Sequence, residues 1–568
     1  MTVTPKTAVV PDRSAVRVAG IAALVSLFSF FYYLQRSDLL LYGDAVAHIN
    51  IARRVFDSQN PGLQQLGTVW LPLPHLLMIP FIFSNAMWQN AAGGSIPSML
   101  AYVLGVVGIF RLVRGMLEGG PYEKAGTKPA AGVSAAIAAF AYGANPNLIY
   151  MQATAMTESL YLALFIWSVV YFAEFIRSLQ KSEDAPGRQP PWSSSRTPLA
   201  RCACCLAAAE LTRYDGWFLA GVVGAAVVVI VLRRWQNQQL QLHRDAAKFL
   251  LGIAVVPVLW LAFNGAVYGN ALAFANGPYS AKAIEQRVGA PNPAFHNVSV
   301  AAIYFLKSAQ LNMAVGNWGR FWLAAALVAL AIGAWVPRLR PQSSQMSLPL
   351  LLLWVPLAFY ALSVAYGSVP LHVYTWWPFA PFNQRYGLQL LPMFAVSAGV
   401  LAASVLLQAT GWRQVGNLAL LVALMVASYA AVWKAEPQCL LEAQRQWRIR
   451  SPLNSLVQRA IARLPRNSTF LMDLSEHVGI MEQAGIPLRQ VVNNENHRPW
   501  KRPSDPEGLW ERTLADPPRY VDFVIAFDGD AVDLRANKTN LTVLEEIHAT
   551  GQPHARIYAA RSATNQSR

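Results

Sequence analysis

The chain has 568 residues, of which 54% are hydrophobic and only 13% are charged, and its mean hydropathy is +0.30. This composition excludes a soluble globular protein of ordinary type and favours a polytopic membrane protein. The net charge of +16 does not indicate nucleic-acid binding, because most Lys and Arg residues lie in short loops beside apolar segments and not in one stripe.

Apolar runs of about 17 to 25 residues can cross a bilayer, and about eleven such runs predict an all-α polytopic membrane domain in residues 1–434. The first run follows Lys6, Arg13 and Arg17 without a small-residue cleavage site, which is typical of a retained signal anchor. The expected spans lie near residues 16–34, 96–114, 129–149, 159–177, 198–212, 216–232, 248–267, 318–336, 347–366, 386–408 and 415–434.

The basic residues alternate from loop to loop. Arg111 and Arg114, then Arg233 and Arg234, and then Arg413 all follow or precede spans on one predicted side. Basic residues near span ends resist translocation, so we expect that side and the N-terminus to be cytoplasmic. An odd number of spans then places the C-terminal part outside a cell inner (plasma) membrane.

The large first external loop, residues 35–95, contains an apolar piece from Val69 to Phe83. If this piece crossed the membrane, the basic loops would fall outside. Its prolines, Pro72, Pro74 and Pro80, also oppose a straight helix. We therefore expect an interfacial or partly re-entrant segment whose irregular backbone is covered by protein.

From about residue 435 the composition becomes that of a soluble domain, so residues 435–568 are predicted to form a small extracytoplasmic α/β domain. Helices are expected at 451–464 and 476–484, strands at 468–472, 521–527, 542–546 and 556–560, and a long loop at 499–518.

Charged and aromatic residues gather near the start of that loop, where they could help to choose an acceptor or could simply be solvated. They are His497, Arg498, Trp500, Lys501 and Arg502.

The external stretch after the first span carries charges that an ordinary loop between spans does not need. Asp44 and His48 are four residues apart and share a face of any helix, and His75 could approach them through the folded loop. Asp44 is a candidate catalytic residue. The alternative is that Asp44 caps a short interfacial helix, Ala45 to Phe56, whose charges face water.

Two further external loops hold ionisable residues at the edge of apolar segments, where a charge is costly without a partner or a function. Glu158 is a candidate catalytic residue; its alternative role is to face the positive end of a helix in its first turn. Arg213, Tyr214 and Asp215 form a short turn that could bind an anionic head group, although Arg213 and Asp215 could equally neutralise each other.

Arg385 and Tyr386 open the tenth expected span, where they could bind phosphate or act as ordinary interfacial anchors. His48, His75 and Glu158 together could form a divalent-metal site, although their spacing matches no metal motif. The sequence contains no GxxxxGK[ST], GxGxxG or HExxH pattern, which argues against nucleotide-driven transport and a membrane zinc protease.

A series of short motifs in one order gives the chain a family resemblance. They are GDAVAHINIARRVFDS and WLPLPHLLMIP in the first external loop, then MTESLYLALF, LTRYDGWFLA, VYGNALAF and NQRYGLQLLP. Over roughly residues 15–410 the chain resembles bacterial membrane glycosyltransferases of the GT-C superfamily, in particular those similar to protein mannosyltransferases and the lipid A aminoarabinose transferase.

The resemblance implies transfer of a sugar from a polyprenyl-phosphate donor to an acceptor (a glycan, lipid or protein) on the outer side of the membrane. It implies that Asp44 is the catalytic base and that Glu158 occupies the second acidic position. Arg213 and Arg385 would hold the lipid phosphate, and a single base predicts inversion at the anomeric carbon. The protein mannosyltransferases carry an Asp-Glu pair where this chain has Asp44 and Ala45, which puts a protein acceptor in doubt.

The candidate substrate-binding residues are therefore Arg213, Tyr214, Asp215, Arg385, Tyr386, His48 and His75. The main rival function is a polytopic transporter or lipid flippase, in which charged residues line a path across the membrane. That reading predicts an internal repeat and charges at mid-depth, whereas the two halves of the sequence show no repeat and the unusual charges lie on one predicted face.

Overall fold

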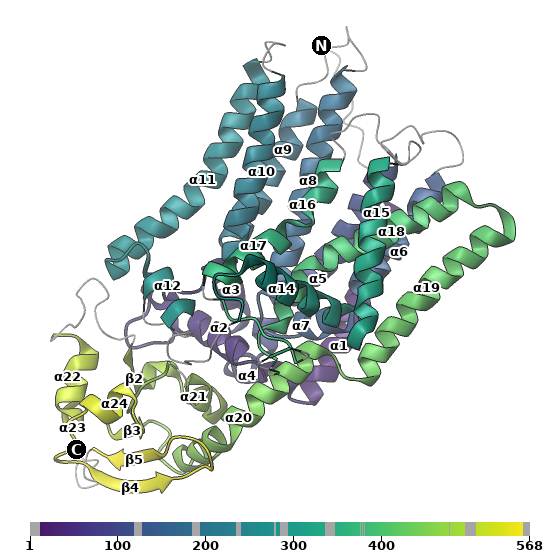
Figure 1. Cartoon of the computed structure of the whole chain (residues 1–568). Helices are drawn as coiled ribbons and strands as arrows, with labels where there is room; N and C mark the ends of the chain where they lie inside the picture. Colours follow the sequence, from purple (N-terminus) through teal and green to yellow (C-terminus); the bar gives the residue numbers. More distant parts are fainter. Residues whose placement is uncertain are drawn as a thin grey trace.

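Long helices make up most of the molecule, and a small sheet lies at one end of them (Figure 1). This computed structural model describes residues 12–118, 128–183, 193–234, 240–277, 280–283, 293–335, 347–367, 369–374, 376–377, 379, 381–475, 477–494 and 507–560. The loop residues His497, Arg498, Trp500, Lys501 and Arg502 lie outside the described residues.

Each predicted span falls on helix. Among the described residues, eight helices are long and apolar enough to cross a membrane, or nine if one bent pair counts as a single span. The predicted class, a helical membrane domain followed by a small mixed domain, is confirmed. The helices of this part, including short ones that are not counted as separate spans, are α1 (Arg13–Gln35), α5 (Ala92–Glu118), α6 (Lys128–Gly143), α8 (Glu158–Glu183), α9 (Ser193–Glu210), α10 (Tyr214–Arg233), α11 (Leu240–Tyr268), α14 (Val298–Met313), α15 (Gly319–Trp335), α16 (Ser347–Leu352), α17 (Val355–Tyr366), α18 (Leu391–Gln408) and α19 (Gly411–Lys434).

Helix α14 was not among the expected spans. It is bent by 107° against the helix that follows it. Ser308, Gln310 and Asn312 interrupt its apolar run, and all three side chains are buried in the structure. Ser308 and Asn312 donate to the carbonyl oxygen of Gln384, at 2.7 Å each. These polar residues made the segment less apolar than a typical span, and two of them, Ser308 and Asn312, bind the helix to the segment that contains Gln384.

Small residues let the long helices approach one another closely. A Cβ at Gly108 on α5 would lie 2.7 Å from Ile166 on α8, and a Cβ at Gly105 would lie 2.6 Å from the Tyr142 hydroxyl on α6. Gly399 on α18 has the same relation to Ala138, at 3.0 Å. In a bilayer, where apolar burial against lipid gives little driving force, such close contact is a principal source of helix association.

The first external loop folds into short helices on top of the long ones. They are η1 (Asp38–Leu40), α2 (Gly43–Arg54), η2 (Leu63–Leu66), α3 (Leu73–Met78), η3 (Ile79–Phe81) and α4 (Asn85–Gln89). Arg53 ties them together, because it pairs with Asp57 at 2.8 Å and donates to the Ile82 carbonyl and the Asn85 side chain, at 2.6 Å each. Within the piece from Val69 to Phe83, α3 is six residues long and therefore too short to cross the membrane, as expected.

The C-terminal part contains a five-stranded sheet in the order β2-β1-β3-β5-β4. Strands β1, β2 and β3 are parallel, whereas β5 is antiparallel to β3 and β4. The four expected strands are present, while β2 and α22, which falls in the expected loop, were missed. The elements are β1 (Phe470–Met472), α21 (Val478–Ala484), η8 (Leu488–Gln490), β2 (Val491–Val492), α22 (Leu509–Ala515), α23 (Pro517–Tyr520), β3 (Phe523–Phe527), α24 (Ala531–Arg535), β4 (Thr542–Ile547) and β5 (Ala555–Ala559).

Helix α20 (Gln438–Ile461) joins the two parts (Figure 1). The expected helix at 451–464 is its second half only. Its first half follows α19 almost directly and packs against α7 (Pro146–Gln152) and η7 (Gln384–Leu390) of the membrane part. The end of the last long helix is therefore not a structural break between the two parts of the chain.

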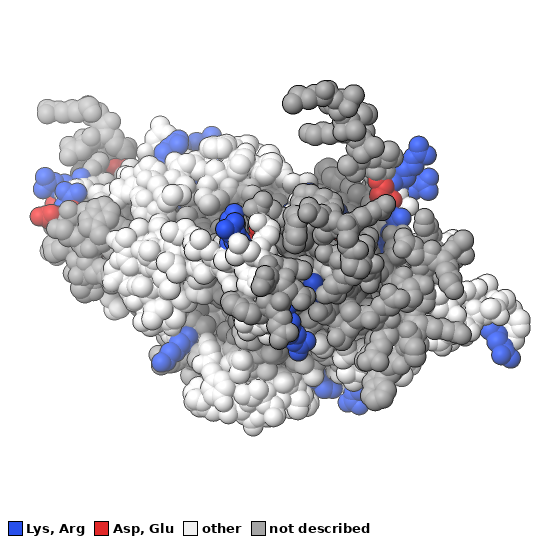
Figure 2. Space-filling model, turned by 90° about the horizontal axis from the view of Figure 1, so that it is seen from above, with Lys and Arg blue, Asp and Glu red and all other residues white. Residues whose placement is uncertain are grey.

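Helix α1 begins beside the end of α5 that carries Arg111 and Arg114. Asp12 pairs there with Arg114, and Arg111 pairs with Glu174 at 2.6 Å. In the view from above, the described Lys and Arg side chains form several separate groups, while described Asp and Glu side chains are few (Figure 2). This is the distribution that the positive-inside rule associates with a cytoplasmic face.

Cysteine labelling tests this topology. In a background with Cys204→Ser and Cys205→Ser, we expect Arg413→Cys at the start of α19 and Asn540→Cys before β4, both at exposed positions, to react from opposite sides of the membrane. The measurement is labelling of intact cells and inverted vesicles with a membrane-impermeant maleimide. Reaction of both positions from one side would show that the topology is wrong.

Candidate functional site

Four of the candidate residues lie at the starts of different helices, on the side of the membrane part that faces the sheet. Asp44 lies in the first turn of α2 and Glu158 begins α8. Arg213 precedes α10, and Arg385 is the second residue of η7. Alternate helices run in opposite directions, so their ends meet at one level and bring these residues together.

Arg385 is the centre of this cluster. Its Nε donates to Oε1 of Glu158 at 3.1 Å and its Nη1 to Oε1 of Glu442 at 3.3 Å. Its Nη2 donates to Oδ2 of Asp44. The side chain is only 4% exposed. A buried guanidinium is tolerated only when carboxylates compensate it, and here each of its three nitrogens has one.

Arg213 forms a second, linked set of contacts. Its Nε donates to both carboxylate oxygens of Asp215, at 3.1 and 3.2 Å, and its Nη2 to the Tyr360 hydroxyl at 2.9 Å. Its Nη1 reaches Thr157 at 3.2 Å and Oε1 of Glu158 at 3.5 Å. The neutralising Arg213–Asp215 pair is therefore present, and Glu158 links both arginines.

The ring of Tyr386 packs between the two guanidinium groups. The Arg213 and Arg385 Cζ atoms lie 5.3 and 5.1 Å from its centroid, and Arg385 also lies 5.1 Å from the ring of Tyr42. Such cation–π contacts hold a guanidinium in place without using its N–H groups. Tyr386 thus contacts the cluster directly, as a substrate-binding candidate beside Arg385 should.

Asp44 differs from the other carboxylates of the cluster in its access to solvent. Its side chain is 38% exposed, whereas Glu158, Asp215 and Glu442 are 1%, 3% and 2% exposed. The residue that precedes α2 is Tyr42, and no side chain caps the helix from that position. Asp44 is therefore not the helix cap of the alternative reading; its carboxylate instead pairs with Arg385 and faces an open side.

His48 and His75 meet each other but not Glu158. Nδ1 of His48 lies 2.9 Å from Nε2 of His75, and the Trp70 ring lies 4.7 Å from the His48 ring. Burial lowers the pKa of His48 to about 3 and that of His75 well below its usual value. Both imidazoles are therefore neutral at physiological pH.

The expected three-residue metal site does not form from these side chains. No group of three or more potential His, Cys, Asp or Glu ligands occurs among the described residues. The facing nitrogens of the two histidines are used in their mutual contact, and Glu158 is bound to the arginines. The described residues therefore do not bring His48, His75 and Glu158 together as one ligand set, because Glu158 is held by the arginines.

Tyr214 lies beside the cluster but makes other contacts. Its ring stacks on Phe274 at 4.8 Å, and its hydroxyl accepts from Trp260 at 3.3 Å and donates to the Thr68 carbonyl at 3.5 Å. It joins α10 and α11 to the first external loop. Among the described residues, no hydrogen bond or cation–π contact joins the Tyr214 side chain to Arg213 or Arg385, and the contacts that it makes are packing contacts.

The sequence analysis missed Glu442 and Tyr360. Glu442 lies in the part of the chain expected to be a separate soluble domain, and Tyr360 lies within an expected span. A single acid in CLLEAQRQW and a single tyrosine in an apolar run carry no local signal. Only the fold brings them to Arg385 and Arg213.

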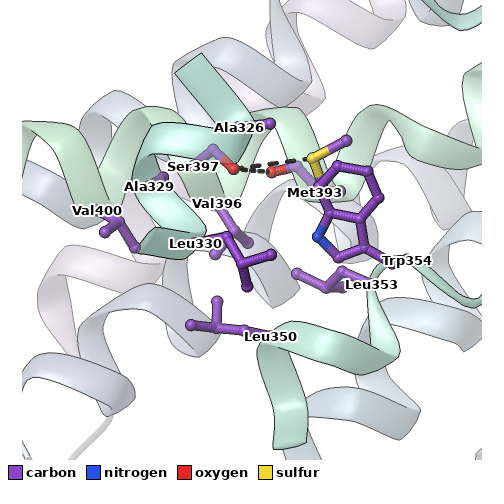
Figure 3. A pocket seen from close by; sticks show the side chains of 10 residues that line it. All are labelled: Ala326, Ala329, Leu330, Leu350, Leu353, Trp354, Met393, Val396, Ser397 and Val400. Atoms are coloured by element: carbon purple, nitrogen blue, oxygen red, sulfur yellow. Dashed lines mark hydrogen bonds between the residues drawn. The ribbon is translucent and has the colours of Figure 1, made fainter. Parts of the chain in front are cut away.

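A pocket of different character lies between α15, α16 and α18 (Figure 3). Its one hydroxyl, that of Ser397, donates to the Met393 carbonyl at 2.8 Å. The pocket therefore offers apolar surface, and α18 continues directly from the segment that carries Arg385. Its lining residues are Ala326, Ala329, Leu330, Leu350, Leu353, Trp354, Met393, Val396, Ser397 and Val400.

This architecture is similar to that of solved membrane transferases. ArnT from Cupriavidus metallidurans, solved bound to undecaprenyl phosphate, matches with a TM-score of 0.52 at 13% identity, over 96% of this chain and 98% of that chain. Its apo structure matches with a TM-score of 0.51 at 12% identity and the same coverage. ArnT is an aminoarabinose transferase of the GT-C superfamily. The chain has a GT-C fold.

The oligosaccharyltransferase from Archaeoglobus fulgidus, in its apo form, also matches this chain, with a TM-score of 0.46 at 12% identity, over 97% of this chain and 74% of that chain. No protein-family model and no curated protein sequence matches the chain. At these identities the comparison establishes the fold and leaves the activity to the residues.

The buried histidines predict a pH-dependent stability for this protein. The pKa of His48 falls from 6.5 in the unfolded chain to about 3, so below pH 6.5 the unfolded chain binds a proton that the folded chain does not. We expect the free energy of unfolding to fall on acidification from about pH 7.5 to about pH 5, and its slope to be smaller in His48→Gln by up to about 1.4 kcal/mol per pH unit.

Thermal unfolding of the purified protein across this pH range measures the difference. The comparison uses the change with pH within each variant, so a constant loss of stability in His48→Gln does not matter. Equal pH dependence in both proteins would contradict a buried, neutral His48.

Proposed function

We propose that the chain is an integral membrane glycosyltransferase that transfers a sugar from a polyprenyl-phosphate donor to an acceptor on the extracytoplasmic face. The observation that carries the proposal is the cluster in which a solvent-accessible Asp44 pairs with the buried Arg385. It occurs in a chain whose fold resembles that of ArnT, which was solved with undecaprenyl phosphate. The cluster lies at the ends of the long helices. A transporter would instead place its charged residues near the middle of the bilayer.

Arg385 and Arg213 are the proposed binding groups for the donor phosphate. Guanidinium groups fit phosphate geometry and keep their charge under all ordinary conditions. Tyr386 packs against both guanidinium groups. The two arginines together therefore fit an anionic head group.

The donor phosphate must compete for N–H groups that are already occupied. Arg385 donates to Glu158, Glu442 and Asp44, and of these only Asp44 is substantially exposed. We propose that the phosphate takes the place of the Asp44 carboxylate on Nη2. Asp44 is then released from Arg385, and its carboxylate is free to contact the acceptor hydroxyl.

In the proposed reaction, the acceptor hydroxyl oxygen bonds to the anomeric carbon while the bond from that carbon to the phosphate oxygen breaks. The hydroxyl proton passes to Asp44, and polyprenyl phosphate leaves with the bonding electrons, stabilised by Arg385 and Arg213. A single displacement inverts the anomeric carbon. Glu158, which is bound to both arginines, is proposed to hold them at the spacing that the phosphate needs.

The remaining assignments follow from this reading. The transferred group is a hexose or pentose, the N-terminus is cytoplasmic in a cell inner membrane, and the C-terminal part faces the outside. Residues 1–434 form the catalytic membrane domain, and residues 435–568 form an extracytoplasmic domain that also contributes Glu442. A divalent ion, if the reaction uses one, needs ligands other than the expected set of His48, His75 and Glu158.

The Asp44→Asn variant tests the role of the base. We expect sugar transfer to fall by about 100- to 10,000-fold, the usual effect of losing a general base. Binding of polyprenyl phosphate should be unchanged or tighter, because the neutral amide competes less well for Arg385. The assay uses purified protein in lipid with a labelled polyprenyl-phosphate sugar, and Glu546→Gln, at an exposed acid on β4, is the control.

Two results would contradict the proposal. Unchanged transfer in Asp44→Asn would remove Asp44 from the mechanism. Movement of lipid or solute without transfer or donor hydrolysis, with every donor tried, would favour the transporter.

The Arg385→Lys variant tests the phosphate site. Lysine keeps the charge but cannot make the three directed contacts of the guanidinium, so we expect polyprenyl phosphate to bind about 10- to 100-fold more weakly. Titration of the purified variant with polyprenyl phosphate measures this, and Arg448→Lys on the exposed side of α20 is the control. Equal affinity for the wild type and Arg385→Lys would place the phosphate elsewhere.

A further inference from the structure

Helix α20 presents three polar side chains toward the cluster at intervals of four residues. They are Glu442, Gln446 and Arg450, and residues at this spacing share one face of a helix. Glu442 is 2% exposed, and Gln446 and Arg450 are half-buried. The neighbouring Arg445 and Arg448 are exposed. The three residues thus form a distinct polar face, directed at the membrane part.

Glu442 contacts the start of η7, the segment that carries Arg385. Its two carboxylate oxygens accept the backbone N–H groups of Asn383 and Gln384, at 2.8 Å each, and Oε1 also accepts from Arg385 at 3.3 Å. The N-cap residue of η7 is Asn383, which makes no capping bond with its own side chain and has a left-handed φ of 56°. The cap of this helix therefore comes from α20.

Gln446 and Arg450 contact the start of α2, the helix that carries Asp44. Oε1 of Gln446 accepts the N–H group of Gly43 at 3.2 Å. Nη2 of Arg450 donates to the carbonyl oxygens of Leu40 and Leu41, at 3.1 and 3.0 Å. The contact is close, since a Cβ at Gly43 would lie 2.6 Å from Nη1 of Arg450. Helix α2 also lacks a capping side chain of its own.

The first N–H groups of any helix lack partners within that helix, and a cap fixes where the helix begins. Here one face of α20 supplies this function for two helices whose reactive residues, Asp44 and Arg385, are 341 positions apart in the sequence. A rigid helix that holds both starting points also fixes the distance between them.

We propose that α20 positions Asp44 and Arg385 relative to each other, with Glu442, Gln446 and Arg450 as positioning residues that do not touch the substrate. The inference rests on the proposed function for its catalytic consequence, but the capping itself can be tested without activity. A second attachment supports it, because Glu482 on α21 accepts from Asn50 of α2 at 2.8 Å. The C-terminal part thus holds α2 at its start and near its middle.

Hydrogen–deuterium exchange of the full-length protein in detergent tests the caps. We expect Gln446→Leu to accelerate exchange in the peptide that contains Gly43 by about tenfold and to leave the peptide around Gln384 unchanged. Glu442→Gln should show the reverse pattern. Each variant is therefore a control for the other, and Arg448→Gln, on the exposed side of the same helix, should change neither peptide.

Steady-state kinetics with a polyprenyl-phosphate sugar tests the catalytic consequence. Gln446→Leu acts on Asp44 and should lower kcat about tenfold with donor KM within twofold of the wild type. Glu442→Gln acts on Arg385 and should raise donor KM about tenfold. Gln446→Glu keeps an acceptor for the Gly43 N–H group and should restore most of kcat, which a loss of folding in Gln446→Leu would not explain.

The outcomes separate the two claims. Unchanged exchange at both helix starts, or altered exchange with unchanged kcat and KM, would overturn the positioning role. If the exchange pattern appears as expected but the wild type transfers no sugar from any polyprenyl-phosphate donor, the capping by α20 stands and the proposed function fails.

Discussion

A guanidinium group buried at the ends of the long helices determines how this molecule is built around its site. Arg385 is 4% exposed, and its charge can be removed from water only because Glu158, Glu442 and Asp44 each accept a hydrogen bond from one of its nitrogens. These carboxylates come from α8, α20 and α2. Satisfying one charge therefore brings together three helices from distant parts of the chain.

The same requirement extends outward from Arg385. Glu158 also contacts Arg213, which in turn is held by Asp215 and Tyr360, so the two arginines belong to one continuous network. Glu442 links the network to α20 and through it to the C-terminal sheet. Charged groups at this depth tolerate few changes, because removing one partner leaves another buried and unpaired. Asp44 is the exception: it is exposed, and it can leave the network when another anion takes its place.

The position of the network explains why the C-terminal part cannot be treated as an appendage. Its first helix supplies the caps of α2 and η7, and α21 contacts α2 a second time. The membrane part alone has the helices that bear Asp44 and Arg385 but not the groups that satisfy their first N–H donors. A site assembled from both parts keeps its geometry only while the two remain packed together.

The sequence by itself determined the class of the molecule and most of the charged site. Long apolar runs, basic residues in alternate loops and isolated charges such as Asp44, Glu158, Arg213 and Arg385 are local features, and each reflects the cost of placing a polar group near lipid. Only the tertiary structure decided which of these charges meet. It separated His48 and His75 from Glu158, gave Tyr214 a packing role, revealed α14 behind its polar residues and brought in Glu442 from beyond the last long helix. The physical reason is that a charged residue beside an apolar segment needs a partner, and this need can be recognised from the sequence. The partner itself lies on another helix end, which comes close only when the chain is folded.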